Sequence, residues 1–220
     1  MDFSTIMSLV WPSTLQTLVM VLSSTVFSVL LGLPLGILLC VTDPVTGIMP
    51  KPILYQVLTR IVNALRSFPF MILMILLFPL SRLIIGTSIG TAATIVPLSI
   101  AAAPFVARII ETALKEVDPG VVQAARAMGS TNSQIILKVL LPEALPSLVS
   151  GVTLTIINLI GYSAMSGAIG GGGLGDLAIR YGYQRNQPMV MIPAVIIILI
   201  MVEVIQLIGS RISARLMAKR

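Results

Sequence analysis

The chain has 220 residues, of which 56% are apolar and 10% are charged, and its formal net charge is +6. Soluble domains carry charges on about a quarter of their residues, so this composition excludes an ordinary soluble protein and predicts an all-α protein that crosses a membrane several times. The positive charges are spread over the ends of apolar segments and form no basic stripe, which excludes a nucleic-acid-binding role.

Uncharged apolar segments long enough to cross a bilayer, which takes about 20 residues, recur along the chain. They predict five transmembrane helices, at residues 15–41, 57–80, 90–110, 145–165 and 189–210. The second helix is the least secure, because the uncharged stretch between Arg66 and Arg82 is only about 15 residues, roughly 22 Å of helix against a hydrocarbon core of ~30 Å. Arg66 is therefore expected near a membrane interface.

The first apolar segment has features beyond a simple crossing. It begins at Met1-Asp2-Phe3 without a positive region and is too long for a secretory signal peptide, so we expect it to stay in the protein. A short interfacial helix over residues 4–13, with Trp11 and Pro12 at its end, can precede a shorter first span.

Small residues predict how the first helix packs. Gly32-x-x-x-Gly36 forms a notch that lets another helix approach closely. Cys40 is the single cysteine. A single cysteine can form neither an intramolecular disulfide nor a cysteine metal cluster, so we interpret Cys40 as a packing residue.

Basic residues are distributed unevenly between the two sides that five crossings create. With the N-terminus outside, the outer segments hold three of them, Arg82, Arg180 and Arg185. The inner segments hold the other eleven, which are Lys51, Arg60, Arg66, Arg108, Lys115, Arg126, Lys138, Arg211, Arg215, Lys219 and Arg220. Because Lys and Arg concentrate on the cytoplasmic side of membrane proteins, we predict the N-terminus outside and the C-terminus inside.

The longest cytoplasmic connection, about residues 111–143, begins with the signals of a short capped helix. Asp118 is expected to cap this helix, Pro119 to occupy its first turn and Gly129 to end it. Helical spacing places one apolar stripe along it, made of Val121, Ala124, Ala125 and Met128, with Gln123 and Arg126 pointing elsewhere.

A second short helix follows in the same connection. Thr131-x-x-Gln134 fits a capping box at its start, and Pro142 is expected to interrupt it. Helices of about ten residues are marginal in isolation, so the apolar stripe of the first one must be covered. Its cover is either the protein's own cytoplasmic face, or lipid headgroups, or a partner protein.

The loop also carries a motif. Gln123-Ala124-Ala125, Gly129 and Val139-x-Leu141-Pro142 resemble the cytoplasmic loop signature of binding-protein-dependent ABC importer permeases, in which Glu-Ala-Ala is followed by a glycine and a distant Ile-x-Leu-Pro. Gln123 stands in place of the usual glutamate, and Val139 in place of the usual isoleucine.

Further similarity covers most of residues 60–185. The segments that carry it are LRSFPF at 65–70, GTSIG at 86–90, AAAPFVARIIETAL at 101–114, LPEALPSLVSG at 141–151 and GYSAM at 161–165. Through them the chain resembles the permeases of methionine importers, which take up both D- and L-methionine.

This resemblance implies the ABC importer permease fold in a single permease domain, residues 1–220, in a bacterial inner membrane. It implies a homodimer that moves substrate by alternating access at the dimer interface, two separate cytoplasmic ATPase subunits and an extracytoplasmic substrate-binding protein. In this family the short loop helix lies in a groove of the ATPase subunit. The matching contact residues here are Val121, Gln123, Ala124, Ala125, Met128, Gly129, Leu141 and Pro142. Two alternatives remain, a permease for another amino acid or small solute, and a non-transporting scaffold that recruits a cytoplasmic partner.

Catalytic and cofactor motifs give no support to an enzyme. No Gly-x-x-x-x-Gly-Lys-Ser/Thr phosphate loop occurs, so ATP is expected to bind elsewhere. The stretch GGGGLG at 170–175 matches Gly-x-Gly-x-x-Gly but lacks the acidic residue about 20 positions on, and we interpret Gly167–Gly175 as an external turn. With no histidine, the chain has neither the usual base of a serine protease nor a His-Glu-x-x-His zinc site. We expect no cofactor and no metal.

Two places inside the predicted spans are candidates for a role in transport. Tyr162, Ser163 and Met165 precede the glycine-rich turn, and two copies of Met165 facing each other would form an apolar gate, although Met165 can equally fill a gap in the bundle. Glu203 is the one acidic residue well inside a span, and a paired or water-reaching carboxylate is a simpler interpretation than a proton relay.

Overall fold

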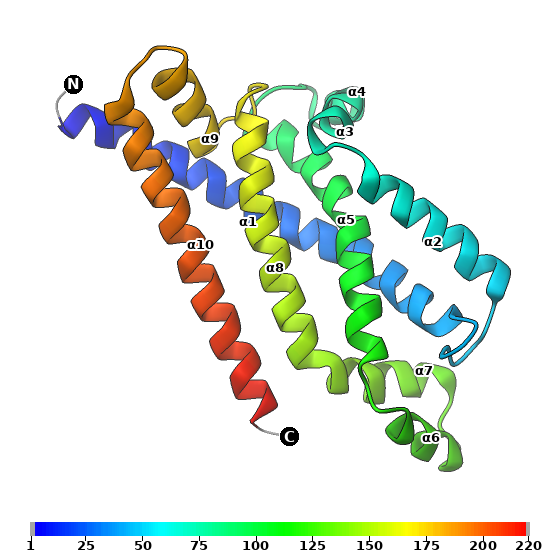
Figure 1. The fold of residues 1–220 in the computed structure, drawn as a ribbon. Helices are drawn as coiled ribbons and strands as arrows, with labels where there is room; N and C mark the ends of the chain where they lie inside the picture. Colours follow the sequence, from blue (N-terminus) through cyan, green and yellow to red (C-terminus); the bar gives the residue numbers. More distant parts are fainter. Residues whose placement is uncertain (1–2, 219–220) are drawn as a thin grey trace. The chain divides into compact units, whose positions relative to one another are not determined.

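The computed structural model describes residues 3–218, in which all regular structure is helical (Figure 1). The expected start of the first segment, at Met1 and Asp2, lies outside the described residues, as do the two terminal basic residues, Lys219 and Arg220. The α-helices are α1 (Phe3–Thr42), α2 (Pro52–Ser67), α3 (Phe70–Leu76), α4 (Phe78–Ile85), α5 (Thr91–Lys115), α6 (Pro119–Ala127), α7 (Asn132–Ile135), α8 (Leu141–Gly167), α9 (Gly173–Leu177) and α10 (Pro188–Met217). Two π-helical turns, η1 (Ile136–Leu140) and η2 (Ala178–Tyr183), complete the set.

The chain forms two compact units, and α1, α5, α8 and α10 contribute residues to both. Unit 1 consists of the chain up to Ser28, Phe68–Ala102 and Thr155–Leu207. Unit 2 consists of Val29–Ser67, Ala103–Leu154 and the chain from Ile208 onward.

Four helical segments are long and apolar enough to cross a membrane. They are Ser4–Thr42, Thr91–Lys115, Asn132–Gly167 and Pro188–Met217. A fifth span results if the bent pair α2 and α3 crosses as one. The prediction of about five crossings is therefore confirmed at the level of length and composition.

The prediction of one continuous helix over residues 57–80 is wrong. The helix ends at Ser67, and α3 begins at Phe70 after a bend of 103°. Proline disfavours the helical conformation in the residue before it and cannot donate a backbone hydrogen bond. Pro69 itself has an extended backbone, with ψ of 126°. The segment therefore turns sharply where the sequence suggested a short crossing.

The first helix is longer than predicted and shows no separate interfacial helix at 4–13. Helix α1 runs without a break from Phe3 to Thr42, through Pro12. In the turn that Pro12 enters, the hydroxyls of Ser13 and Thr14 donate to the carbonyls four residues earlier, at 2.9 and 2.8 Å. These bonds go to Leu9 and Val10, next to the Ser8 carbonyl that Pro12 leaves without its usual N–H donor, and the helix continues through the proline.

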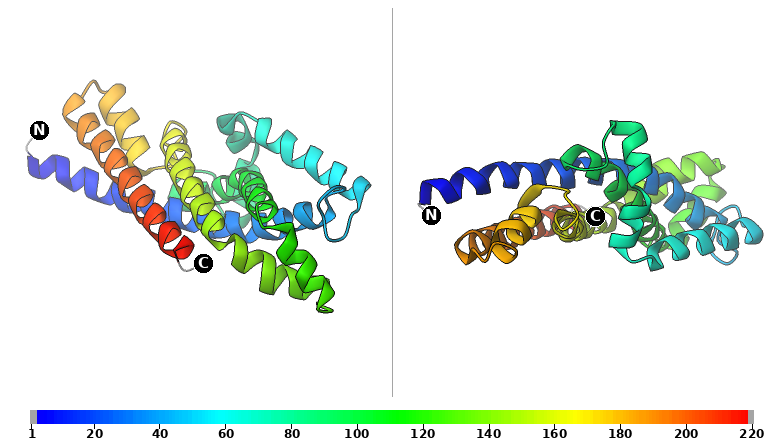
Figure 2. Two further views of the ribbon diagram at one scale, coloured as in Figure 1. Left: turned by 60° about the horizontal axis from the view of Figure 1, so that its bottom comes forward. Right: turned by 90° about the horizontal axis from the view of Figure 1, so that it is seen from above.

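Pro142 likewise fails to interrupt its helix. The segment from Asn132 to Gly167 is continuous through α7, η1 and α8 (Figures 1 and 2). A π-helical turn at Ile136–Leu140 ends two residues before the proline. The wider turn makes room for a ring that lacks an N–H, so the chain passes from α7 into α8 without the predicted interruption.

Unit 1 has an apolar core between its helices and a short helix that the sequence did not predict. Met20, Leu98 and Leu159 are fully buried in one cluster. Beside it, α9 packs on the first turns of α10 through Leu174 and Val190 (Figure 1). The turn expected at Gly167–Gly175 covers only residues 168–172, because α8 runs to Gly167 and α9 begins at Gly173, where Gln16 and Thr17 of α1 accept hydrogen bonds from the backbone.

Unit 2 confirms both packing predictions for the first helix. A Cβ at Gly36 would lie 2.6 Å from the Ala107 carbonyl oxygen, and a Cβ at Gly32 would lie 2.7 Å from the Val106 Cβ, so only glycine permits α1 to approach α5 this closely. Cys40 is a buried free thiol in the apolar cluster on which α6 packs.

Candidate functional site

The helix α6 has the caps that its sequence predicts. The side chain of Asp118 accepts a hydrogen bond from the Gly120 N–H at 2.7 Å, and Pro119 occupies the first turn. At the other end Gly129 has a φ of +79°, and the next N–H, of Ser130, donates to the Ala125 carbonyl at 3.1 Å. This pattern is a Schellman cap, which ends a helix within one residue.

The connection to α7 is fixed in the same manner. Thr131 and Gln134 form the predicted capping box, in which the Thr131 N–H donates to the Gln134 side chain at 2.8 Å and the Gln134 N–H donates to the Thr131 hydroxyl at 3.3 Å. Local hydrogen bonds therefore define α6 and the start of α7, and Figure 1 shows the two as a short pair between α5 and α8.

Two faces of α6 have different surroundings. On the inner face Val122 and Ala125 pack against the apolar cluster of unit 2. On the outer face Val121 is 42% exposed and Met128 is 85% exposed, and Ala124 between them is also exposed. The predicted four-residue stripe is therefore divided, because Ala125 turns with Val122 into the core while the other three residues point away from the protein.

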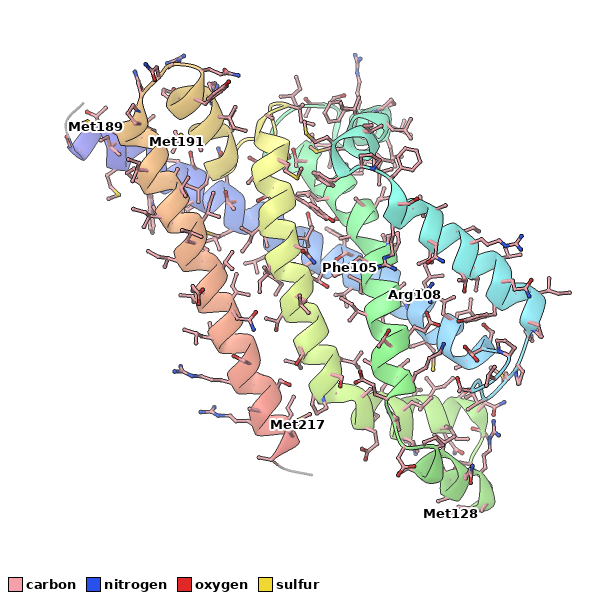
Figure 3. All side chains as sticks on the ribbon, viewed as in Figure 1. Phe105, Arg108, Met128, Met189, Met191 and Met217 are labelled. Atoms are coloured by element: carbon pink, nitrogen blue, oxygen red, sulfur yellow. The ribbon has the colours of Figure 1, made fainter. Side chains whose placement is uncertain are left out.

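The remaining contact candidates have mixed exposure. Gln123 and Gly129 are exposed, as is Pro142, whereas Leu141 packs partly against the apolar cluster of unit 2. Gln123 also lines a cavity of about 310 Å³ beside α6. In Figure 3 Met128 lies at the tip of the helical pair.

Arg126 attaches α6 to the connection between α1 and α2. Its guanidinium Nη2 donates to the Ile48 carbonyl oxygen at 2.8 Å. The sequence interpretation had Arg126 pointing away from the apolar stripe, and its contact with a loop 78 residues earlier was not predicted. The inner face of α6 is thus held by apolar packing and by one charge-assisted hydrogen bond.

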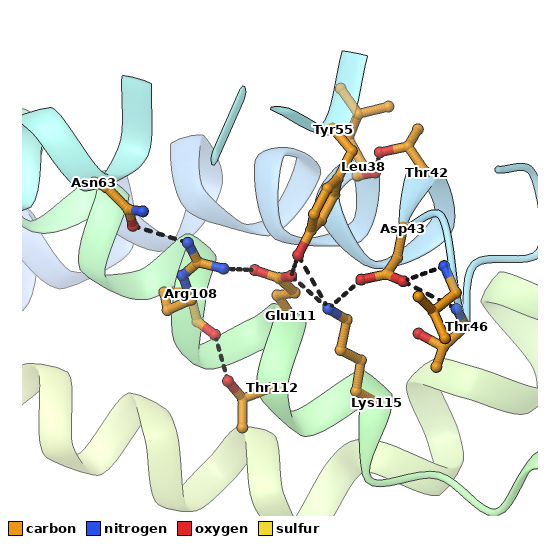
Figure 4. Close-up of polar contacts among 11 residues, drawn as sticks. Leu38, Thr42, Asp43, Thr46, Tyr55, Asn63, Arg108, Glu111, Thr112 and Lys115 are labelled. Atoms are coloured by element: carbon orange, nitrogen blue, oxygen red, sulfur yellow. Dashed lines mark hydrogen bonds and ion pairs between the residues drawn. The ribbon is translucent and has the colours of Figure 1, made fainter. Parts of the chain in front are cut away.

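A buried ion-pair network in unit 2 includes the first residue of the loop between α1 and α2 (Figure 4). Glu111 is 2% exposed, and its two carboxylate oxygens accept from Arg108 Nη1 at 2.6 Å and from Lys115 Nζ at 2.7 Å. Lys115 also pairs with Asp43 at 2.7 Å, and the Tyr55 hydroxyl donates to Glu111 at 3.1 Å. Two carboxylates and two cations therefore compensate one another.

The network fixes the loop on which α6 rests. Asp43 accepts the backbone N–H groups of Val45 and Thr46, at 2.8 and 2.9 Å. Burial alone would raise the pKa of Asp43, but the hydrogen bonds from Lys115 and from these two backbone groups outweigh it and hold the pKa well below its usual range. Arg108 precedes Glu111 by three residues and Lys115 follows it by four, a helical spacing that is visible in the sequence, whereas Asp43 could not be paired with them from sequence alone.

The predicted gate residues occupy different environments in unit 1. The Tyr162 ring stacks on Phe70 with centroids 4.3 Å apart, and Ser163 is buried with its hydroxyl donating to the Ile160 carbonyl. Met165 is 45% exposed. Only Met165 of the three therefore presents its side chain to the surroundings.

Glu203 lies on an exposed face of α10 and forms no ion pair within residues 3–218. Its carboxylate is accessible from outside the single chain. The local pairing that the sequence suggested is therefore absent from the described part of the molecule.

Comparison with known proteins agrees with this arrangement. A family model described as "Binding-protein-dependent transport system inner membrane component" matches residues 32–219. A relative from Vibrio cholerae named "Probable D-methionine transport system permease protein MetI" is 49% identical over 203 residues, covering 92% of this chain and 90% of the relative. The "D-methionine transport system permease protein MetI" of Escherichia coli K12 is 52% identical over 152 residues, covering 69% of this chain and 70% of the relative.

Solved structures give the same result. One described as "Inward facing conformations of the MetNI methionine ABC transporter" is 46% identical with a TM-score of 0.95, covering 98% of this chain and 99% of the other. Another, "Crystal structure of an amino acid ABC transporter with histidines", is 23% identical with a TM-score of 0.72, covering 100% and 99% of the two chains, and shares the fold. The chain belongs to the family of binding-protein-dependent transport system inner membrane components.

Proposed function

We propose that this chain is the permease subunit of an ATP-driven importer that moves methionine into the cytoplasm. Support comes from relatives named for D-methionine transport that match over nearly the whole chain, and from the structural match to a methionine ABC transporter. The working assembly contains two copies of this chain, two ATPase subunits on the cytoplasmic side and a substrate-binding protein outside. ATP hydrolysis takes place in the ATPase subunits.

The proposed mechanism depends on the exposed outer face of α6. Val121, Ala124 and Met128 form an apolar, exposed strip on a short helix whose other face is already packed. An amphipathic helix with small residues fits closely into a groove of a partner protein. The strip is therefore the surface that docks on the ATPase subunit, with Gln123, Gly129 and the start of α8 beside it.

Rigid caps let α6 transmit movement. Three residues join it to the end of α5, and from Asn132 the chain is continuously helical into α8. Because both ends of α6 are capped and Arg126 holds its inner face, a displacement of the docked helix moves two spans with it. This coupling drives alternating access at the interface between the two copies.

The orientation follows from the charge distribution. With α6 in the cytoplasm, the N-terminus lies outside and the C-terminus inside, in agreement with the excess of basic residues on the cytoplasmic segments. At the outer end, Met165 is the exposed member of the gate candidates and would meet its counterpart in the second copy. Tyr162 and Ser163 position it from within unit 1.

Uptake by a reconstituted complex tests the function. Proteoliposomes with the permease, the ATPase and the binding protein should accumulate labelled L- and D-methionine when ATP is supplied, and other amino acids much less. Recruitment and activity of the ATPase without accumulation of any amino acid would contradict transport and leave a scaffold role. Preferred accumulation of a different amino acid would overturn the methionine assignment alone.

A further inference from the structure

A second cavity, of about 330 Å³, lies entirely within unit 2 and forms an open groove along α5. Its walls come from the end of α2, the cytoplasmic halves of α5 and α8, and the last turns of α10. The polar lining includes Arg66, Arg108, Thr112, Glu116, Ser147 and Ser150. In a chain with only 10% charged residues, this is an unusual concentration of polar groups.

One charge in the groove lacks a partner. The Arg66 guanidinium forms no hydrogen bond or ion pair with any residue in the described part of the chain, whereas the Arg108 guanidinium is bound by Glu111 and Asn63. Asn63 and Arg66 are three residues apart on α2 and share a face, so the free guanidinium lies at the Arg108 end of the groove.

The opposite end is acidic and rich in hydroxyls. Glu116 accepts a hydrogen bond from the Ser147 hydroxyl at 2.8 Å, and the Ser150 hydroxyl donates to Ser213 at 2.9 Å. Glu116 follows Arg108 by eight residues, about 12 Å along a helix, and adjoins the connection to α6. The groove therefore leads from a cationic end toward an anionic end at the predicted cytoplasmic surface.

Such a lining is incompatible with lipid. Polar side chains inside membrane proteins face water-filled paths, because hydrocarbon cannot hydrogen-bond to them. The part of α10 that belongs to unit 2, in contrast, exposes apolar side chains, such as Ile208 and Ile212. The groove lining therefore suits water, and the exposed apolar face of α10 suits lipid.

We propose that this groove carries a zwitterionic amino acid from the interface between the two copies to the cytoplasm, with Arg66 binding the substrate carboxylate and Glu116 then receiving its ammonium group. The inference rests on the proposed function, since it names residues that contact the transported amino acid. The groove is longer than the separation of the two charges on one amino acid, so the two contacts occur in succession. Within the described residues the Arg66 guanidinium is unpaired, and the Glu116 carboxylate is bound only by the Ser147 hydroxyl. Each group can therefore bind the substrate and then release it.

The apolar part of the lining suits an unbranched side chain. Phe105 lies one turn before Arg108 on α5, and Leu154 and Met217 are exposed at the groove (Figure 3 labels Phe105, Arg108 and Met217). A thioether packs favourably against an aromatic edge and against flexible apolar side chains. Methionine matches both the charged and the apolar parts of this path.

A matched pair of arginine variants on α2 tests the substrate contact. Arg66→Gln in the reconstituted complex should lower methionine uptake about tenfold, the effect of losing one charge-assisted hydrogen bond, while ATPase recruitment stays intact. Arg60→Gln is the control, because Arg60 is exposed on the same helix and does not line the groove. Equal uptake by the two variants would overturn the role of Arg66.

Cysteine labelling tests whether the groove holds water. In a Cys40→Ala background, Ser150→Cys should react with a charged, membrane-impermeant thiol reagent from the cytoplasmic side, and added methionine should slow the reaction. Ile208→Cys, on an exposed apolar part of α10 outside the groove, should react only with a lipid-soluble maleimide. If Ser150→Cys behaves like Ile208→Cys, lipid fills the groove and the proposal fails. If the unsubstituted complex moves no methionine but the groove still labels, the proposed function is wrong and the hydrated path stands.

Discussion

At the scale of single residues, the helix caps of α6 and α7 were predictable and the ion-pair network was only partly so. Asp118, Gly129 and Thr131 act within a few residues of themselves, so the sequence contains the whole signal. Asp43 reaches Lys115 across 72 positions, and no local pattern indicates that contact. Local chemistry is readable from sequence, whereas contacts made by folding are not.

The left-handed conformation of Gly129 gives the first prediction. Gly129→Ala should destabilise the end of α6 by about 1 kcal/mol, because a Cβ is unfavourable at a φ of +79°. The measurement is ATP hydrolysis coupled to uptake, together with thermal unfolding in detergent. Gly161→Ala is the control, since Gly161 is within a regular helix and a Cβ there meets no atom within 4 Å. A loss of coupling as large for Gly161→Ala would remove the special role of the Gly129 turn.

Glu111 gives a larger effect. Glu111→Gln leaves Arg108 and Lys115 facing a neutral group in a buried position, so we expect a loss of about 3 kcal/mol in the free energy of unfolding. Asp176→Asn breaks an ion pair with Arg180, which is more than half exposed, and should cost only about 0.5 kcal/mol. Thermal unfolding of both variants in the same detergent compares them, and similar midpoints would show that the network adds no stability.

Asp43 links stability to pH. Its folded pKa lies below the ordinary value of 3.8, so the ionised carboxylate stabilises the fold above that pH. As the pH falls below this value the unfolded chain takes up the proton first, and the contribution is lost. Asp43→Asn should therefore be less stable than the unsubstituted protein at pH 7, with the difference shrinking in acid. A constant difference down to pH 3 would contradict this assignment.

At the scale of helices, the composition of each apolar segment predicted that it forms a helix. The prolines led to wrong predictions of where a helix is continuous. Pro12 and Pro142 lie inside continuous helices, whereas Pro69 comes at a bend of 103°. The sequence shows each proline alike. What differs is the surrounding structure, such as hydroxyls that bond to carbonyls or a π-helical turn before the ring, and this is decided by packing.

A charge should have different effects on the two faces of α6. Val121→Asp should abolish binding of the ATPase subunit while thermal stability is nearly unchanged, because its side chain is exposed in the single chain. Val122→Asp should lower stability instead, since it places a charge against the apolar cluster of unit 2. Pull-down of the ATPase and unfolding of the permease measure the two effects separately. Loss of ATPase binding without loss of stability in both variants would show that the face assignment is wrong.

At the scale of the whole molecule, an apolar chain of this kind is completed only by its surroundings. The span in α5 is the most buried of the four long ones and that in α10 the least, so α10 leaves nearly all of its apolar surface for lipid or a second copy. Composition predicted the membrane and the number of spans, and a motif predicted the family. Neither could predict which exposed faces meet lipid, because that depends on partners outside the chain.

Met165 provides the prediction that depends on the assembled molecule. Its exposed thioether lies near the C-terminal end of α8, where a second copy would bring the same residue opposite in the proposed assembly, and an apolar constriction of this kind closes a path by excluding water. Met165→Ala should widen the constriction and let methionine leak into proteoliposomes without ATP, while ATP-driven uptake starts from a raised background. Met189→Ala is the control, because Met189 is also exposed but lies in the first turn of α10. Tight vesicles with Met165→Ala would mean that Met165 only fills a gap between helices, and the gate would have to be sought in other residues at the interface of the two copies.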